Sequence, residues 1–219
     1  MPAVNDTTLI EFCEWTLRLR PAAASPARLL LMIHGFTGDE NSMWVFAHDL
    51  PPDTWVLAPR APFASEPFGY SWRPFADGDS SRTSLEMLQP SIEALIGLVD
   101  AYSASVGLDV GQFDVMGFSQ GAALAALLAM QHPSRVARLA LLAGFVPRGA
   151  EDLIASRPLS GKRVFVAHGT QDNLVPVERA RRSVELLEQA GAQVTYCEAE
   201  VGHKLSLDCM RALRVYLQE

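Results

Sequence analysis

The sequence predicts an α/β protein with a mainly parallel central sheet and helices on both faces. Apolar runs of strand length alternate along the chain with helix-length amphipathic segments, a pattern typical of parallel sheets with crossover helices. A Gly-x-Ser-x-Gly motif at residues 117–121 stands between a strand-like run and an apolar helix of small residues. The chain has 219 residues and 49% hydrophobic content, so one domain over residues 1–219 can bury a sizeable core.

The first half of the chain is expected to begin with short strands and to contain two helices. Residues 8–20 alternate in part and resemble one extended strand, and residues 28–33 and 54–58 are short apolar strands. Residues 41–49 and 84–105 have helical patterns. Residues 59–81 are rich in proline and aromatic residues and have no clear period, which predicts an ordered loop.

The second half repeats the strand-then-helix alternation. Its predicted strands are residues 112–116, 136–143, 163–167 and 193–198, and its predicted helices are residues 122–130, 177–189 and 205–217. Pro133 and Gly191 follow two of these helices and are typical of their ends. The sequence contains no internal repeat, linker or low-complexity tract.

Composition excludes several classes of partner. The net charge is −7 with no basic cluster, so nucleic acid and anionic membrane are unexpected partners. Cys13, Cys197 and Cys209 are sparse and lack a Cys-x-x-Cys pair, which argues against a disulfide framework or a zinc site. This predicts a reducing, cytoplasmic location. No signal peptide or membrane-spanning apolar run is expected from the sequence.

Ser119 is the candidate nucleophile, because its motif has the strand–turn–helix context of a nucleophile elbow. Neighbours two before and two after such a serine must approach other chain segments closely, and Gly117 and Gly121 fit that need. The turn also places Ser119 at a helix N-terminus, where backbone N–H groups favour developing negative charge.

The candidate partners of Ser119 follow other strands, at the edge of a parallel sheet where ligand sites form. Asp172 follows residues 163–167, and His203 follows residues 193–198. The order Ser119, Asp172, His203 is the serine–acid–histidine order of this kind of fold. His203 would serve as general base and Asp172 would orient it. Backbone N–H groups of Gln120 and Phe36 are the candidate oxyanion donors.

Other histidines and acidic residues are candidates for the same roles. His48 and His132 lie near helix ends, while His34 and His168 are expected to support the site structurally. Asp152 and Glu198 compete with Asp172 for the acid. The segment 77–79, Asp-Gly-Asp, resembles a fragment of a calcium loop but lacks the remaining ligand spacing. We therefore expect no metal and no cofactor.

The chain resembles the bacterial carboxylesterases of the phospholipase/carboxylesterase (acyl-protein thioesterase-like) family of α/β-hydrolases. The segments that carry the resemblance are residues 31–40, 58–62, 117–121, 168–176 and 202–203. The resemblance implies an α/β-hydrolase fold without a large cap domain and oxyanion donors at Phe36 and Gln120. It also implies a possible homodimer. Residues 67–75 match the family's aromatic loop only in part, so substrate length is the least transferable property.

Phe63, Phe68, Tyr70 and Trp72 are candidate residues of the substrate pocket, together with Phe36 and Phe75. A mostly apolar pocket suits an uncharged acyl group. The sequence therefore predicts a serine hydrolase of small to medium carboxylic esters, with an acyl-serine intermediate. A thioesterase or lysophospholipase for longer acyl groups is an alternative, as is a non-catalytic ligand-binding protein of the same fold. Ser119 disfavours lactone hydrolysis on this fold, which a cysteine nucleophile would have favoured.

Overall fold

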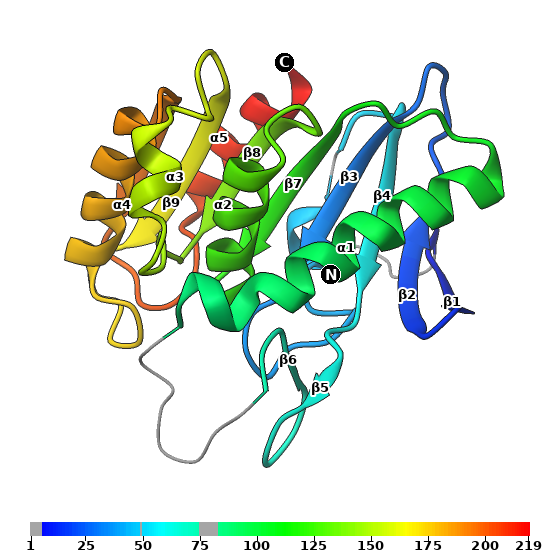
Figure 1. The fold of residues 1–219 in the computed structure, drawn as a ribbon, viewed down its shortest axis with the longest axis horizontal. Helices are drawn as coiled ribbons and strands as arrows, with labels where there is room; N and C mark the ends of the chain where they lie inside the picture. The colour runs from blue at the N-terminus through cyan, green and yellow to red at the C-terminus, as the bar shows by residue number, and fades with distance from the viewer. Residues whose placement is uncertain (1–5, 49, 75–82) are drawn as a thin grey trace.

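A mixed eight-stranded sheet forms the centre of the computed structural model, which describes residues 6–48, 50–74 and 83–219. The strand order is β1–β2–β4–β3–β7–β8–β9–β10 (Figure 1). The strands are β1 (Thr8–Phe12), β2 (Trp15–Arg20), β3 (Arg28–Ile33), β4 (Thr54–Pro59), β7 (Phe113–Phe118), β8 (Val136–Leu142), β9 (Arg163–Gly169) and β10 (Gln193–Ala199). β2 pairs antiparallel with both β1 and β4, and every other pair in this sheet is parallel.

Helices cover both faces of the sheet. In the view of Figure 1, α1 and α2 cross in front of the strands and α5 lies behind them. The helices are α1 (Leu85–Val106), α2 (Gln120–Gln131), α3 (Glu151–Ala155), α4 (Val177–Gln189), α5 (Leu207–Gln218) and a short 3-10 turn, η2 (Trp44–Phe46). Alternate residues of β3 join two different cores: Leu29 and Leu31 pack with α1 and α2, whereas Leu30 and Met32 pack with η2 and α5. The predicted fold class is confirmed.

Some predicted elements differ from the structure. Residues 8–20 form a hairpin rather than one strand, with a turn at Cys13, whose φ is 51°. Of the helix predicted over residues 41–49, the described part contains only the 3-10 turn η2. The predicted loop 59–81 contains a small antiparallel pair, β5 (Phe63–Ala64) and β6 (Tyr70–Ser71). The short helix α3 was not predicted.

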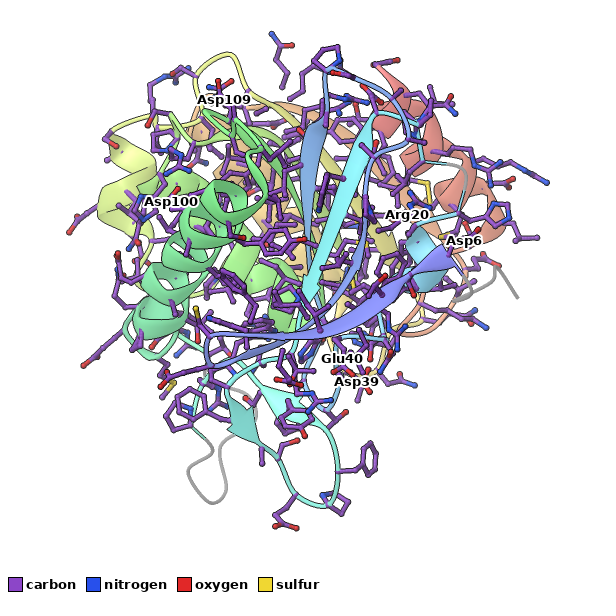
Figure 2. All side chains as sticks on the ribbon, turned by 90° about the vertical axis from the view of Figure 1, so that its right-hand side faces the viewer. Asp6, Arg20, Asp39, Glu40, Asp100 and Asp109 are labelled. Carbon is purple, nitrogen blue, oxygen red and sulfur yellow. A yellow bond between two sulfur atoms is a disulfide. The ribbon has the colours of Figure 1, made fainter. Side chains whose placement is uncertain are left out.

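Cys197 and Cys209 form a disulfide that links β10 to α5 (Figure 2). The expectation of unpaired cysteines was therefore wrong for these two, and Cys13 alone is free and exposed. The spacing of 12 residues did not reveal the pair, because it depends on α5 folding back onto β10. Among the described helices, none is both long and apolar enough to span a membrane.

Candidate active site

Ser119 lies at the sharp turn between β7 and α2. Its backbone has φ 53° and ψ −115°, a conformation that side-chain-bearing residues rarely adopt. A Cβ atom on Gly117 would lie 2.2 Å from the carbonyl oxygen of Gly121, and one on Gly121 would lie 2.2 Å from that of Ile33. Both glycines are therefore required by close backbone approach, as the motif predicted.

Asp172 and His203 form a short hydrogen-bonded pair in the loops after β9 and β10. The His203 Nδ1 atom is 2.6 Å from Asp172 Oδ2, and Asp172 Oδ1 accepts the N–H groups of Leu174 and Val175, each at 2.9 Å. Burial, the largest single influence, raises the pKa of Asp172, but the hydrogen bonds from Val175, His203 and Leu174 together outweigh it and lower that pKa. The carboxylate is therefore ionised and accepts the Nδ1 proton, which leaves Nε2 able to accept another.

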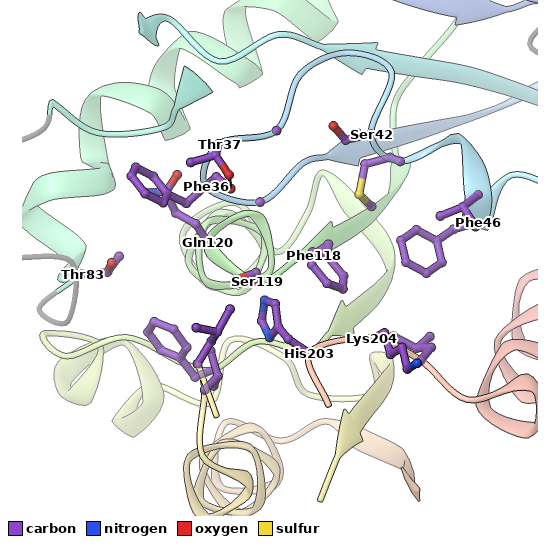
Figure 3. A pocket seen from close by; sticks show the side chains of 18 of the residues that line it. Phe36, Thr37, Ser42, Phe46, Thr83, Phe118, Ser119, Gln120, His203 and Lys204 are labelled. Carbon is purple, nitrogen blue, oxygen red and sulfur yellow. Dashed lines mark hydrogen bonds between the residues drawn. The ribbon is translucent and has the colours of Figure 1, made fainter. Parts of the chain in front are cut away.

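The structure brings Ser119, Asp172 and His203 together at the carboxyl edge of the sheet. Figure 3 shows the His203 imidazole beside Ser119. The imidazole also packs edge-on against the Phe118 ring, with 5.0 Å between ring centroids. This grouping of one hydroxyl, one imidazole and one oriented carboxylate can perform nucleophilic catalysis.

The loop after β3 is held firmly against Ser119. A Cβ atom on Gly35 would lie 3.2 Å from that of Ser119, and the neighbouring Phe36 lines the same cavity as Ser119 and Gln120. Buried His34 supports this loop: its Nε2 atom accepts the Ala61 N–H at 3.0 Å, and its Nδ1 atom lies 2.7 Å from the Gly35 carbonyl oxygen. Burial is the main cause that lowers the pKa of His34, so its ring is neutral and structural, as expected.

The side chain of Gln120 has a role that was not predicted. Its Oε1 atom accepts the Trp72 N–H at 2.9 Å, and its Nε2 atom donates to Ser71 Oγ at 3.1 Å. Trp72 in turn donates its indole N–H to the His34 carbonyl oxygen at 2.8 Å. The residue after the nucleophile thus ties β6 and Trp72 to the elbow. In the sequence, only the glutamine that follows Ser119 could have indicated this role.

His168 lies beneath the pair, as expected of a packed strand-end residue. It is buried, its Nε2 atom is 2.8 Å from the Val175 carbonyl oxygen, and the same atom is 3.4 Å from Asp172 Oδ2. Of the competing acids, Asp152 lies on α3, and Glu198 pairs with Arg181 at the surface. Neither occupies the position that Asp172 holds beside His203.

Ser119 opens onto a cavity of about 900 Å³. One side is mostly apolar and lies between η2 and the segment that enters α5; its lining residues are Met43, Val45, Phe46, Phe118, Lys204, Leu205 and Met210. The other side is formed by residues near α3 and α4; it includes Arg73, Thr83, Phe145, Leu174, Val175 and Arg179. In Figure 3, Phe46, Phe118 and Lys204 lie on one side of Ser119 and Thr83 lies on the other.

Of the predicted pocket aromatics that the structure describes, only Phe36 belongs to this lining. Trp72 is fully buried in the core, Phe68 is 66% exposed, and the Tyr70 ring packs under the Arg60 guanidinium. Phe63 pairs with Ser71 in the small hairpin. The assignment of Phe63, Phe68, Tyr70 and Trp72 is corrected, because the aromatic density of the loop did not indicate which way each ring points.

Two predictions concern residues that the structure does not describe. Phe75 and the Asp-Gly-Asp segment 77–79 lie outside the described residues. Within the described ranges, no group of three or more histidine, cysteine or acidic residues could hold a metal ion.

Comparisons with known proteins agree with this architecture. The chain is 27% identical over 172 residues to acyl-protein thioesterase 1 of Kluyveromyces lactis. The aligned residues cover 71% of this chain and 74% of that protein. It is 25% identical to a probable inactive carboxylesterase of Oryza sativa subsp. japonica, over 83% of this chain and 80% of that one. The crystal structure of a carboxylesterase from Mesorhizobium loti matches its fold with a TM-score of 0.81, 24% identity and coverage of 98% and 99%. Residues 18–219 match the phospholipase/carboxylesterase family model, and the chain therefore belongs to the phospholipase/carboxylesterase family.

Proposed function

We propose that this protein hydrolyses carboxylic esters of small to medium acyl chain through an acyl-serine intermediate on Ser119. The observation that carries the proposal is the 2.6 Å pair between His203 Nδ1 and ionised Asp172, beside a serine in a strained elbow. Family membership supports ester hydrolysis as the reaction class. We further propose that residues 1–219 form one catalytic domain that needs no cofactor.

The steps follow from the chemistry of the three residues. His203 Nε2 accepts the Ser119 proton as Oγ attacks the ester carbonyl, and Asp172 stabilises the imidazolium that forms. Backbone N–H groups of Phe36 and Gln120 stabilise the tetrahedral oxyanion, each contributing about 3–4 kcal/mol. The imidazolium then gives its proton to the departing alcohol. Water, activated by His203, attacks the acyl-serine, releases the carboxylic acid and restores Ser119.

A thioesterase or lysophospholipase acting on longer acyl groups is the second candidate. The cavity of about 900 Å³ lies near the upper end of the common range of about 300–1,000 Å³ for ligand pockets. The thioesterase relative supports this alternative. The inactive relative raises a non-catalytic function as a third candidate, but Ser119, Asp172 and His203 are all present here.

Hydrolysis of p-nitrophenyl esters of increasing acyl length tests the proposal, with wild type beside Ser119→Ala. We expect turnover by the wild type, with kcat in the folded variant lowered by at least about a thousandfold. Palmitoyl-coenzyme A and a lysophospholipid, assayed in parallel, distinguish the second candidate. A folded Ser119→Ala protein with a near-normal rate would exclude Ser119 as the nucleophile.

A further inference from the structure

The cavity at Ser119 has a charge opposite to that of the whole molecule. The chain carries a net charge of −7, yet the described lining contains the cations Arg73, Arg179 and Lys204 and no aspartate or glutamate. Among the described residues, Arg179 and Lys204 therefore give the lining a positive charge that favours a negatively charged ligand.

Arg179 is the most informative of these cations. It lies in the first turn of α4 and is half-buried, with its guanidinium carbon 3.5 Å from the centroid of the Phe145 ring. Phe145 itself lines the cavity. Burial is the main cause that lowers the pKa of Arg179, and nearby Arg148 lowers it further. An arginine nevertheless remains charged at neutral pH.

In the described part of the chain, no carboxylate pairs with the Arg179 guanidinium. Its neighbours on the same helix differ: Arg181 pairs with Glu198 at 2.8 Å, and Arg182 pairs with Glu185 at 2.6 Å. A partly buried charge without an opposite charge is costly. Stacking on Phe145 fixes the plane of the guanidinium, and a planar, fixed fork of N–H donors suits a carboxylate or a phosphate.

The two sides of the cavity differ in chemistry. Phe46 and Phe118 stack at 5.9 Å between centroids on the side near η2, and they pack with Leu205 and Met43 in one apolar cluster. Lys204 is the one cation of the described lining on this side. Arg179 and Phe145 lie with Val175 on the side near α3 and α4. A substrate whose scissile bond sits at Ser119 would therefore place an apolar group on one side and a polar group on the other.

We infer that the substrate is an ester with an apolar group on one side of the scissile bond and a carboxylate or phosphate on the other. Arg179 is the specificity-determining residue that binds this anion. This inference rests on the proposed ester hydrolysis at Ser119 and names the substrate class for it. The anion supplies the opposite charge that Arg179 lacks among the described residues.

Two matched pairs of esters test the inference by turnover. The carboxylate arm compares mono-p-nitrophenyl glutarate with p-nitrophenyl butyrate, and the phosphate arm compares butyryl glycerol 3-phosphate with glycerol monobutyrate. We expect the wild type to prefer the anionic ester in at least one pair by about ten- to a hundredfold in kcat/KM, as expected for a charged hydrogen bond. The arm that shows the preference identifies the anion.

Substitutions in α4 test whether Arg179 causes the preference for the anionic ester. Arg179→Met keeps an apolar stem on Phe145, and we expect it to lower the anionic-to-neutral ratio of kcat/KM by about tenfold or more. Arg179→Lys should retain part of the ratio because it keeps the charge. Arg182→Met, a surface variant of the same helix, should leave the ratio unchanged. A wild type that prefers the neutral ester in both pairs, or an unchanged ratio in Arg179→Met, would overturn the inference.

A binding measurement separates this inference from the proposed function. Calorimetric titration of glutarate and glycerol 3-phosphate into Ser119→Ala needs no turnover, and Ser119→Ala/Arg179→Met is its matched partner. Binding of at least one anion that weakens about tenfold or more in the double variant supports the site, even if the wild type hydrolyses no ester. Absence of binding by both anions, or equal binding by the two proteins, would overturn it.

Discussion

At the scale of single residues, Ser119 has a strained backbone conformation that contacts with neighbouring residues hold in place. Its φ of 53° costs about 1–3 kcal/mol for a residue with a side chain, and such strain persists only where neighbouring structure imposes it. The Ser119 N–H donates to the Leu142 carbonyl oxygen at 2.9 Å, and the close passage of Gly117 past Gly121 closes the turn. The strain presents the hydroxyl at the edge of the sheet.

Alanine substitutions at two glycines test this account of the turn. Gly117→Ala should lower the free energy of unfolding by about 3 kcal/mol or more, because its Cβ would overlap the Gly121 carbonyl. Gly97→Ala is the control: it lies exposed on α1, where a Cβ meets no atom within 4 Å. There the change should stabilise the protein by about 0.5–1 kcal/mol. Urea denaturation measures both, and an unaltered midpoint for Gly117→Ala would contradict the account.

The residues at strand ends were predictable, whereas the residues that shape the cavity were not. Ser119, Asp172 and His203 could be found because each follows a strand that ends at one edge of the sheet. Arg179, Phe145 and the other cavity residues come from loops and helix starts, whose directions depend on packing rather than on local pattern. The sequence therefore predicted the candidate catalytic residues better than the residues that would select the substrate.

At the scale of elements, the disulfide frames the segment that carries His203. Cys197 lies on β10 and Cys209 lies in the first turn of α5, and His203 lies between them in the connecting loop. A link across 12 residues restricts the unfolded chain and fixes both ends of that loop. It thereby contributes to holding His203 opposite Asp172.

Removal of this disulfide should destabilise the protein measurably. For Cys197→Ala/Cys209→Ala we expect a loss of about 3 kcal/mol, equivalent to a melting temperature lower by roughly 6–12 °C. Dithiothreitol should lower the melting temperature of the wild type in the same way and leave the double variant unaltered. Cys13→Ala, at the exposed free cysteine, is the control that should match the wild type. Equal melting temperatures for all three proteins would contradict the stabilising role.

Element prediction succeeded where period and burial agree. The predicted bounds of β3 and α4 match the structure, because an apolar run between polar ends and a one-sided helical stripe are strong local signals. The helix predicted over residues 41–49 was wrong because Trp44 is buried by tertiary packing rather than by a helical face. The β1–β2 hairpin was missed because its turn uses Cys13 and not a glycine.

At the scale of the whole molecule, the cores lie on the two faces of the sheet, whereas the candidate catalytic residues lie at one edge of it. Two cores on opposite faces of the sheet are filled by alternate residues of the same strands, and they fix where the strands end. The loops after β3, β7, β9 and β10 then meet at one edge, around the cavity. This arrangement explains how residues 34–203 can form one site although they are distant in sequence.

The central claim is that Ser119 becomes covalently acylated with His203 as its base. The most direct measurement is mass spectrometry of the protein after reaction with a fluorophosphonate, a reagent that modifies activated serines. We predict one added phosphonyl group, located in the peptide that contains Ser119, and its loss or strong slowing in a folded His203→Ala variant. Modification at another serine, or equal labelling of the His203→Ala variant, would contradict the account.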